Sequence, residues 1–231
     1  MKKLIKHILS FLLILCIVLG LFHLSQKIIH HHNPNSVTQT SISKEVSQNS
    51  SSQSQQTNQL NQNNNICHPQ YIEYHNQKVV DWNAPTGNYP DLTNFNANQL
   101  LIQVNQQKQL LSIYNKDTHQ LLTQFVISTG KSGFETPNGN FKIQSQHGKW
   151  FYNSKPNIQE GAYDYVSFYQ HGVYLFHSVP CDQNGQPIAS RMGKLGHKNS
   201  HGCIQLSFPD IKWFYHTFTQ PNKIDTQVTI F

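Results

Sequence analysis

Charged residues are scarce in this sequence: Asp, Glu, Lys and Arg make up 12% of its 231 residues. Arg191 is the only arginine, so a bidentate arginine clamp has one source at most. The formal net charge is +6, but the lysines and histidines are scattered, whereas nucleic-acid binding usually needs a clustered basic face. We therefore expect no nucleic-acid partner. A mild positive balance also suits a position near an anionic cell envelope.

Cysteine is scarce too. The four cysteines are Cys16, Cys67, Cys181 and Cys203, and no two of them form a C-x-x-C pair. This spacing argues against a zinc site of the usual kind. A disulfide between Cys67 and Cys181 stays open, because sequence alone does not show proximity.

The hydrophobic fraction, 37%, is too low for one compact globule of this length. Residues 1–29 combine a basic start with an uncharged apolar run over residues 8–24, which reaches the lower end of a bilayer span. The positive charges precede the run, so we expect a single-pass anchor in the cell membrane with the remainder outside the cytoplasm. A cleaved signal peptide is the alternative, but residues 25–30 offer no A-x-A site.

The next segment, residues 30–65, is rich in Ser, Gln and Asn and is predicted to be a disordered linker. Its flexible part would span about 30 Å, enough to hold a domain away from the membrane. Residues 66–97 contain Trp82, Pro85 and Tyr89 and are expected to be an extended lead-in that packs on the following domain.

Residues 98–231 predict a mainly β domain with its own core. Short apolar or alternating runs separated by polar turns are typical of strands. One short helix is expected over residues 208–217, with Pro209 and Asp210 in its first turn. The strand candidates lie at residues 100–104, 109–114, 121–129, 141–143, 165–168, 172–177 and 227–231.

The run Ser200-His201-Gly202-Cys203 has the features of a cysteine nucleophile. Such a site needs a base, a group that orients the base, and backbone N–H donors for the developing oxyanion. Gly202 removes the Cβ that would obstruct substrate and allows a turn that aims N–H groups beside the sulfur. An isolated cysteine is more often a buried apolar filler, so this run alone leaves the interpretation open.

Three histidines are candidate bases: His177, His197 and His201. His177 ends a predicted strand, and a base on a rigid strand end that meets the nucleophile across space has the best geometry. The carbonyl of Ser178 would accept the proton on Nδ1 of His177 and fix the tautomer.

These motifs resemble those of the L,D-transpeptidases of the YkuD family, which cross-link bacterial peptidoglycan. The family signature is a His, a variable gap, and then Ser/Thr-His-Gly-Cys, here His177 and residues 200–203. The resemblance covers about residues 98–231 and includes further blocks. These are Ser128-Thr129-Gly130, residues 136–143, residues 172–177, Leu195-Gly196, and Asp210 with Lys212-Trp213.

The resemblance implies a β-sandwich of mixed sheets with a helix beside it, and no metal or organic cofactor. Cys203 would be the nucleophile, His177 the proton donor and acceptor, and Ser178 the residue whose backbone orients His177. Gly202 would furnish an oxyanion N–H together with Cys203, while His201 and Ser200 shape the site. The substrates would be peptidoglycan stem peptides, and we expect a monomer.

Two departures from the family pattern are visible. Gln205 stands where the family commonly has Arg; it offers only neutral hydrogen bonds, so we expect a difference in substrate affinity or fine specificity. The 25 residues between His177 and Cys203 also exceed the gap in compact members, and we expect the extra length to form a flap.

The expected reaction is acyl transfer through Cys203, with release of D-Ala and formation of 3→3 cross-links. Three alternatives remain. Water as acceptor would make the protein an L,D-carboxypeptidase, a degenerate site would leave a wall-binding module, and Cys203, His201, His177 and His197 could form a metal site.

Overall fold

The computed structural model describes residues 65–231. The anchor predicted for residues 1–29, and the linker except for its last residue, lie outside the described residues. Within residues 65–231, no helix combines the length and the apolar character that crossing a bilayer requires.

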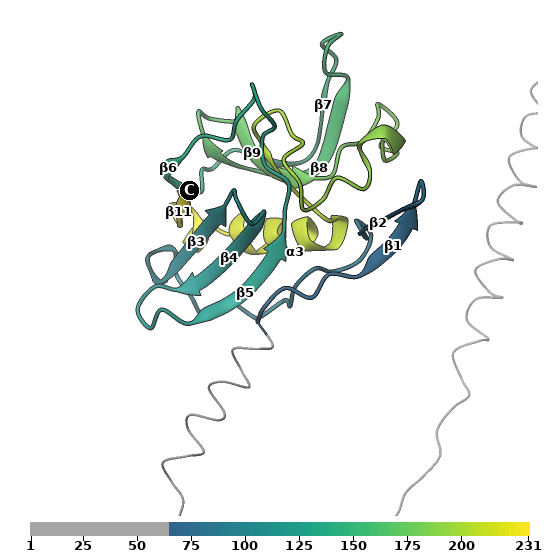
Figure 1. Ribbon diagram of the computed structural model, residues 1–231. Coiled ribbons are helices and arrows are strands. Elements are labelled where there is room, and N and C mark those ends of the chain that lie inside the picture. The colour runs from purple at the N-terminus through teal and green to yellow at the C-terminus, as the bar shows by residue number, and fades with distance from the viewer. Residues whose placement is uncertain (1–64) are drawn as a thin grey trace, which may run out of the picture. The chain divides into compact units, whose positions relative to one another are not determined.

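The largest sheet has five strands in the order β5-β4-β3-β11-β6 (Figure 1). It is mixed, because the C-terminal strand β11 runs parallel to β3 and antiparallel to β6. Strand β3 alternates between buried and half-buried residues, so one face of the sheet packs on the core. The strands are β3 (Leu100–Asn105), β4 (Leu110–Asn115), β5 (Leu121–Val126), β6 (Gly139–Lys142) and β11 (Gln227–Ile230).

A second sheet has four strands in the order β10-β9-β8-β7. Here β10 pairs with β9 in parallel, and the other neighbours are antiparallel. The main core cluster contains buried residues from both sheets, which therefore share one hydrophobic core. The strands are β7 (His147–Asn153), β8 (Glu160–Tyr169), β9 (Tyr174–Ser178) and β10 (Ile204–Leu206).

One α-helix, α3 (Phe208–Phe218), is present in the described part of the chain. The hydroxyl of Ser207 caps it by accepting from the N–H of Asp210 (3.3 Å), and Pro209 sits in the first turn, where no N–H is needed. Three further short segments, Ala97–Gln99, Ala189–Arg191 and Pro221–Lys223, are 3-10 turns.

The prediction of a mainly β domain with mixed sheets and one helix is confirmed. Four strands were not predicted from the sequence. Strand β7 contains an aromatic run without a clean period of two, and β10 has only three residues, all buried. The antiparallel hairpin of β1 (Tyr71–Tyr74) and β2 (Gln77–Val80) lies in the lead-in.

The lead-in forms a second, smaller core with the segment between β9 and β10. Val79, Val80 and Trp82 are buried in one cluster with Met192 and Leu195. The hydroxyl of Tyr74 also donates to the carbonyl of Ala189 (2.8 Å). Cys181 is fully buried and exchanges backbone hydrogen bonds with Gly161 (2.8 Å each way). The segment between β9 and β10, which was expected to form a flap, is therefore held against the rest of the domain by these contacts.

A buried carboxylate joins the lead-in to α3. Asp210 is fully buried and accepts hydrogen bonds from the backbone N–H (3.2 Å) and hydroxyl (2.6 Å) of Thr86 and from the hydroxyl of Tyr89 (2.9 Å). Burial raises the pKa of Asp210, although these donors act to lower it. The Thr86 hydroxyl in turn accepts from the N–H of Val126 on β5 (2.9 Å). One threonine thus joins lead-in, helix and sheet.

Replacing Thr86 by valine preserves the shape but leaves the Val126 N–H without a partner and removes the hydroxyl hydrogen bond to the buried carboxylate of Asp210. We expect Thr86→Val to lower the free energy of unfolding by about 2–4 kcal/mol, since buried unpaired groups retain their desolvation cost. Denaturant unfolding monitored by circular dichroism measures this. The matched control is Thr118→Val at an exposed turn, expected to change stability by about 0.5 kcal/mol or less. Equal effects of the two substitutions would contradict the role given to Thr86.

Candidate active site

The parallel pairing of β10 with β9 brings the predicted nucleophile to the predicted base. Gln205 pairs with His177 in the ladder, and Ile204 pairs with Phe176. Cys203 therefore enters the ladder beside Leu175, two residues before His177. Alternate residues of a strand share one face, so Cys203, His177 and Gln205 lie on the same side of this strand pair. All three line one cavity of about 620 Å³.

The His177 ring is held in one tautomer. Its Nδ1 lies 2.6 Å from the carbonyl oxygen of Ser178. A carbonyl only accepts, so Nδ1 carries the proton and Nε2 is left with a free lone pair. Phe151 packs its ring against His177 at 5.5 Å between centroids. The Ser178 hydroxyl is fixed as well, accepting from Tyr163 N–H (2.9 Å) and donating to the carbonyl of Val179 (2.8 Å).

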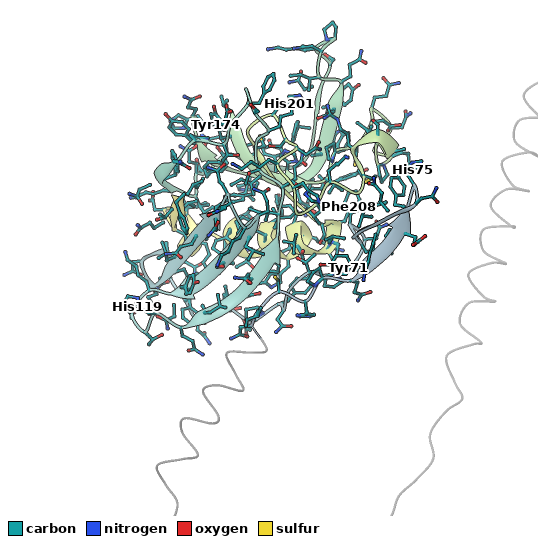
Figure 2. All side chains as sticks on the ribbon, viewed as in Figure 1. Tyr71, His75, His119, Tyr174, His201 and Phe208 are labelled. Carbon is teal, nitrogen blue, oxygen red and sulfur yellow. The ribbon has the colours of Figure 1, made fainter. Side chains whose placement is uncertain are left out.

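A tight turn presents Cys203. The hydroxyl of Ser200 donates to the carbonyl of Cys203 (2.5 Å) and accepts from the N–H of Gly202 (3.1 Å), which closes the turn on itself. Gly202 has φ +112°, a left-handed conformation that favours glycine. A Cβ there would also lie 3.0 Å from the ring of Tyr174, which Figure 2 labels together with His201.

Thr136 ties this turn to a neighbouring loop. Its hydroxyl donates to the carbonyl of Gly202 (2.8 Å) and accepts from the N–H of Gly130 (2.9 Å). Ser128 and Gln205 exchange backbone hydrogen bonds on the other side of β10 (2.8 and 2.9 Å). The separate sequence blocks around residues 128–130, 136–143 and 200–203 therefore meet in one hydrogen-bonded unit.

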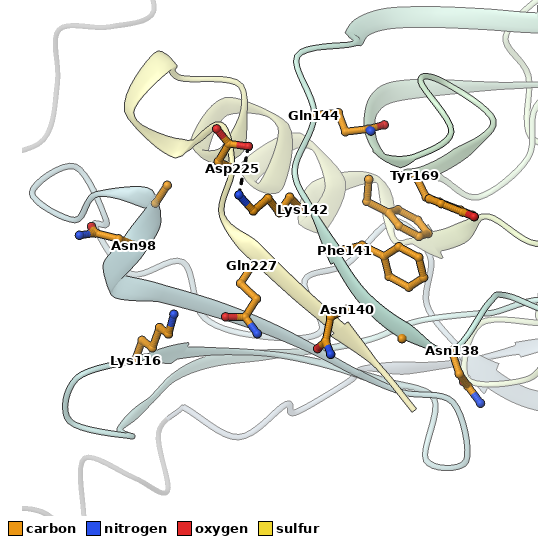
Figure 3. A pocket seen from close by; sticks show the side chains of 13 residues that line it. Asn98, Lys116, Asn138, Asn140, Phe141, Lys142, Gln144, Tyr169, Asp225 and Gln227 are labelled. Atoms are coloured by element: carbon orange, nitrogen blue, oxygen red, sulfur yellow. Dashed lines mark ion pairs between the residues drawn. The ribbon is translucent and has the colours of Figure 1, made fainter.

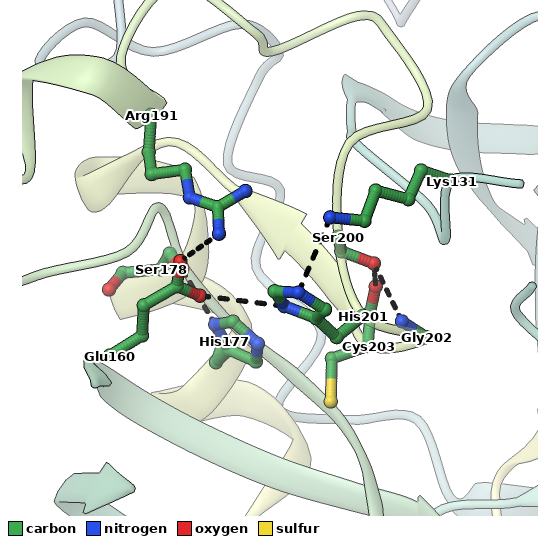
Figure 4. A network of polar contacts seen from close by, with 9 residues as sticks. All are labelled: Lys131, Glu160, His177, Ser178, Arg191, Ser200, His201, Gly202 and Cys203. Atoms are coloured by element: carbon green, nitrogen blue, oxygen red, sulfur yellow. Dashed lines mark hydrogen bonds and ion pairs between the residues drawn. The ribbon is translucent and has the colours of Figure 1, made fainter. Parts of the chain in front are cut away.

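A charged network surrounds His201 (Figure 4). Its Nδ1 lies 3.7 Å from a carboxylate oxygen of Glu160, and its Nε2 lies 3.4 Å from Nζ of Lys131. The second oxygen of Glu160 pairs with Arg191 at 2.6 Å. Sequence reasoning missed Glu160 and Lys131; Arg191 had a signal, because it is the only arginine in the chain.

His197 does not join this group. It lines a separate hollow with Gln106 and Phe231, away from the cavity that contains Cys203. The four-residue metal set considered from sequence is therefore not assembled. Cys67 and Cys181 are free thiols.

A family model described as the L,D-transpeptidase catalytic domain (YkuD) matches residues 99–230, more than half of the chain. The chain belongs to the YkuD family of L,D-transpeptidase catalytic domains. The resemblance inferred from the sequence motifs is thereby confirmed, and the protein is an enzyme of this family.

One relative is YciB of Bacillus subtilis (strain 168), a protein provisionally named an L,D-transpeptidase. It is 36% identical over 149 residues, which cover 63% of this chain and 73% of YciB. An L,D-transpeptidase from Mycobacterium smegmatis aligns with a TM-score of 0.46 at 19% identity, over 58% of each chain. One from Mycobacterium tuberculosis H37Rv aligns at 0.44 and 16%, over 58% of this chain and 57% of that one. The chain thus spans less than two thirds of either solved structure.

Burial keeps both central groups of this YkuD domain uncharged at neutral pH. It lowers the pKa of His177 from 6.5 to about 4, although the hydrogen bond to Ser178 acts in the opposite direction. It raises the pKa of the Cys203 thiol from 9.0 to about 11, with a backbone hydrogen bond from Leu175 as a smaller opposing effect. The resting pair is therefore a thiol and a neutral imidazole.

The raised thiol pKa predicts slow alkylation of Cys203. At pH 7 we expect iodoacetamide to modify it about 100-fold more slowly than an ordinary cysteine, because the thiolate is the nucleophile. Timed labelling with peptide mapping isolates Cys203 from the other cysteines. The rate should rise with pH up to about 11, and His177→Gln should leave the profile unchanged. A plateau that begins near neutral pH would indicate a thiolate–imidazolium pair instead.

The lowered His177 pKa predicts a loss of stability in acid. Between pH 6.5 and about 4 the unfolded chain binds a proton at His177 that the folded chain does not, so folding weakens as pH falls through this window. The maximum loss is about 3 kcal/mol. Denaturant unfolding at several pH values should show this slope, and His177→Gln should flatten it. The exposed His119→Gln is the control, and an identical slope in both variants would refute the assignment.

Proposed function

We propose that the protein is a peptidoglycan L,D-transpeptidase that forms 3→3 cross-links by cysteine acyl transfer and releases D-Ala. The observation that carries this proposal is the hydrogen bond from Nδ1 of His177 to the Ser178 carbonyl (2.6 Å). It leaves Nε2 as a base in the same cavity that Cys203 lines.

In the first step, Sγ of Cys203 attacks the carbonyl carbon of the third stem residue, a diamino acid. Because the resting thiol is protonated, Nε2 of His177 takes its proton as the S–C bond forms. The C–N bond to D-Ala then breaks, and the protonated His177 gives its proton to the leaving amine. A thioester on Cys203 remains.

In the second step, an amine from a neighbouring stem attacks the thioester. Nε2 of His177 accepts the proton that this amine loses, and the C–S bond breaks as the new amide forms. The thiolate that leaves is protonated by His177, which returns the pair to its neutral resting state. No cofactor takes part in the proposed cycle.

The oxyanion in each step needs backbone donors. The N–H of Gly202 already donates to the Ser200 hydroxyl (3.1 Å). The N–H of Cys203 makes no hydrogen bond within the described residues, so we assign it as the principal donor. Gly202 then contributes the conformation of the turn rather than its N–H.

Gln205 lies beside His177 in the strand ladder and lines the cavity. A neutral amide at this place lets His177 stay uncharged, whereas an arginine would add a fixed positive charge next to it. We propose that Gln205 affects substrate affinity.

We also propose that the uncharged run at residues 8–24 anchors the enzyme in the membrane, with the catalytic domain facing the wall.

The test uses muropeptide monomers with tetrapeptide stems and measures released D-Ala and dimers by mass spectrometry. We expect Cys203→Ala to abolish both products and His177→Gln to slow them by about 10²–10⁴-fold. Cys67→Ala, another free thiol outside the cavity, is the matched control and should keep full activity.

The products also separate the alternatives. D-Ala released without any dimer would identify an L,D-carboxypeptidase. Identical results for the unmodified protein and Cys203→Ala, with no D-Ala released, would refute the catalytic proposal and favour a wall-binding module.

A further inference from the structure

A groove of about 950 Å³ runs along the edge strand β6 and is larger than the catalytic cavity. It shares no lining residue with that cavity. In Figure 3, Asn98, Lys116 and Gln227 lie to one side of β6, and Phe141 and Tyr169 lie to the other. The proposed reaction gives this groove no role.

Side-chain amides dominate the polar lining of the groove. An amide offers two donors and an acceptor without any charge. Asn140 uses its Oδ1 to accept from the hydroxyl of Thr229 (2.9 Å). The side chains of Asn98 and Gln227 make no hydrogen bond within the described residues. Their amide donors and acceptors are therefore available to a ligand in the groove. The five amides are Asn98, Asn138, Asn140, Gln144 and Gln227.

The charged lining is close to balanced. Lys142 and Asp225 lie 3.7 Å apart and pair with each other, with both side chains largely exposed. Lys116 is the remaining charged residue of the groove. A polyanion would need several cationic contacts, so the groove suits an uncharged polar polymer better.

Aromatic rings form the other wall. Phe141 and Tyr169 have ring centroids 4.9 Å apart, and Tyr169 is 36% exposed. Such rings provide a rigid apolar surface with a polar tip. A pyranose matches this pair of surfaces, because its ring faces carry C–H groups and its rim carries hydroxyl and amide groups.

Gln144 connects the groove to the catalytic cavity. Its side-chain oxygen accepts from the N–H of His171 (3.1 Å) and from the hydroxyl of Ser167 (2.8 Å). Gln144 lines the groove, whereas His171 and Gln146 line the cavity. The two hollows therefore adjoin at this contact. Three extended stem residues span about 10 Å, which is a distance suited to neighbouring sites.

We propose that this groove binds the glycan strand of the wall, a chain of N-acetylated amino sugars, while the attached stem peptide enters the catalytic cavity. The identity of the polymer rests on the proposed function. The rival occupant is an extended peptide that pairs with the β6 edge. That edge is four residues long and ends at the exposed Lys142, features that discourage added strands.

The test uses a chito-oligosaccharide, a peptide-free polymer of N-acetylglucosamine, and the full-length chain carrying Cys203→Ala. Isothermal titration calorimetry should detect binding. We expect Asn98→Ala and Gln227→Ala to weaken it about three- to tenfold each, the effect of losing a neutral hydrogen bond. The matched control is Asn184→Ala at an exposed turn outside the groove.

A second pair of variants tests the aromatic wall. Tyr169→Ala should also weaken binding, whereas Tyr71→Ala, at an exposed tyrosine on β1 outside the groove, should not. Because Tyr169 also contacts Tyr174 (5.5 Å between centroids), its removal can disturb folding. Asn98 is exposed and its side chain makes no hydrogen bond within residues 65–231. Asn98→Ala should therefore fold normally, and its effect on binding can be interpreted directly.

Three results would overturn the proposal: no binding of the oligosaccharide, equal affinity in groove and control variants, or displacement of the oligosaccharide by a sugar-free tetrapeptide. The probe carries no peptide and the variant carries no nucleophile. Absence of D-Ala release by the unmodified enzyme would therefore refute the proposed reaction and leave the glycan result standing. On sugar-linked substrate, Asn98→Ala should raise KM and leave kcat unchanged.

Discussion

The parallel pairing of β10 with β9 is the constraint on which the site depends. This register sets Gln205 opposite His177 and brings Cys203 onto the same face two residues earlier. A shift by one residue would turn Cys203 to the face opposite His177. The backbone bonds between Ser128 and Gln205, and the hydroxyl of Thr136 on Gly202, hold β10 and its turn from the other side.

The candidate nucleophile and base could be predicted from the sequence because each belongs to a short local pattern. The Ser200–Cys203 run and a histidine at a strand end are short-range patterns, and the alternation in β3 predicted a half-buried strand. The network of Glu160, Arg191 and Lys131 was not readable, because its members come from separate parts of the chain and meet only after folding. Strand β10 was missed because three buried residues carry no periodic signal.

Uncharged groups lie at the centre of the cavity that contains Cys203 and predominate in the groove along β6. In the catalytic cavity, burial leaves the His177–Cys203 pair neutral, and Gln205 adds no charge beside it. In the groove along β6, amides outnumber charged residues. Three charged side chains do meet near His201, where Glu160 contacts both Arg191 and the imidazole and Lys131 lies 3.4 Å from the imidazole.

The small core formed by the lead-in determines where this enzyme can be truncated or cleaved without loss of structure. The family match begins at residue 99, but Thr86 holds Asp210 at the start of α3. Val79 and Val80 also pack with Met192 and Leu195, just upstream of the turn that carries Cys203. A truncation at the family boundary would expose that apolar cluster and leave a buried carboxylate without its donors. We therefore expect the cooperative folding unit to include the lead-in, which precedes the family match, and cleavage within residues 66–97 to destabilise the turn that carries Cys203 without removing any residue of it.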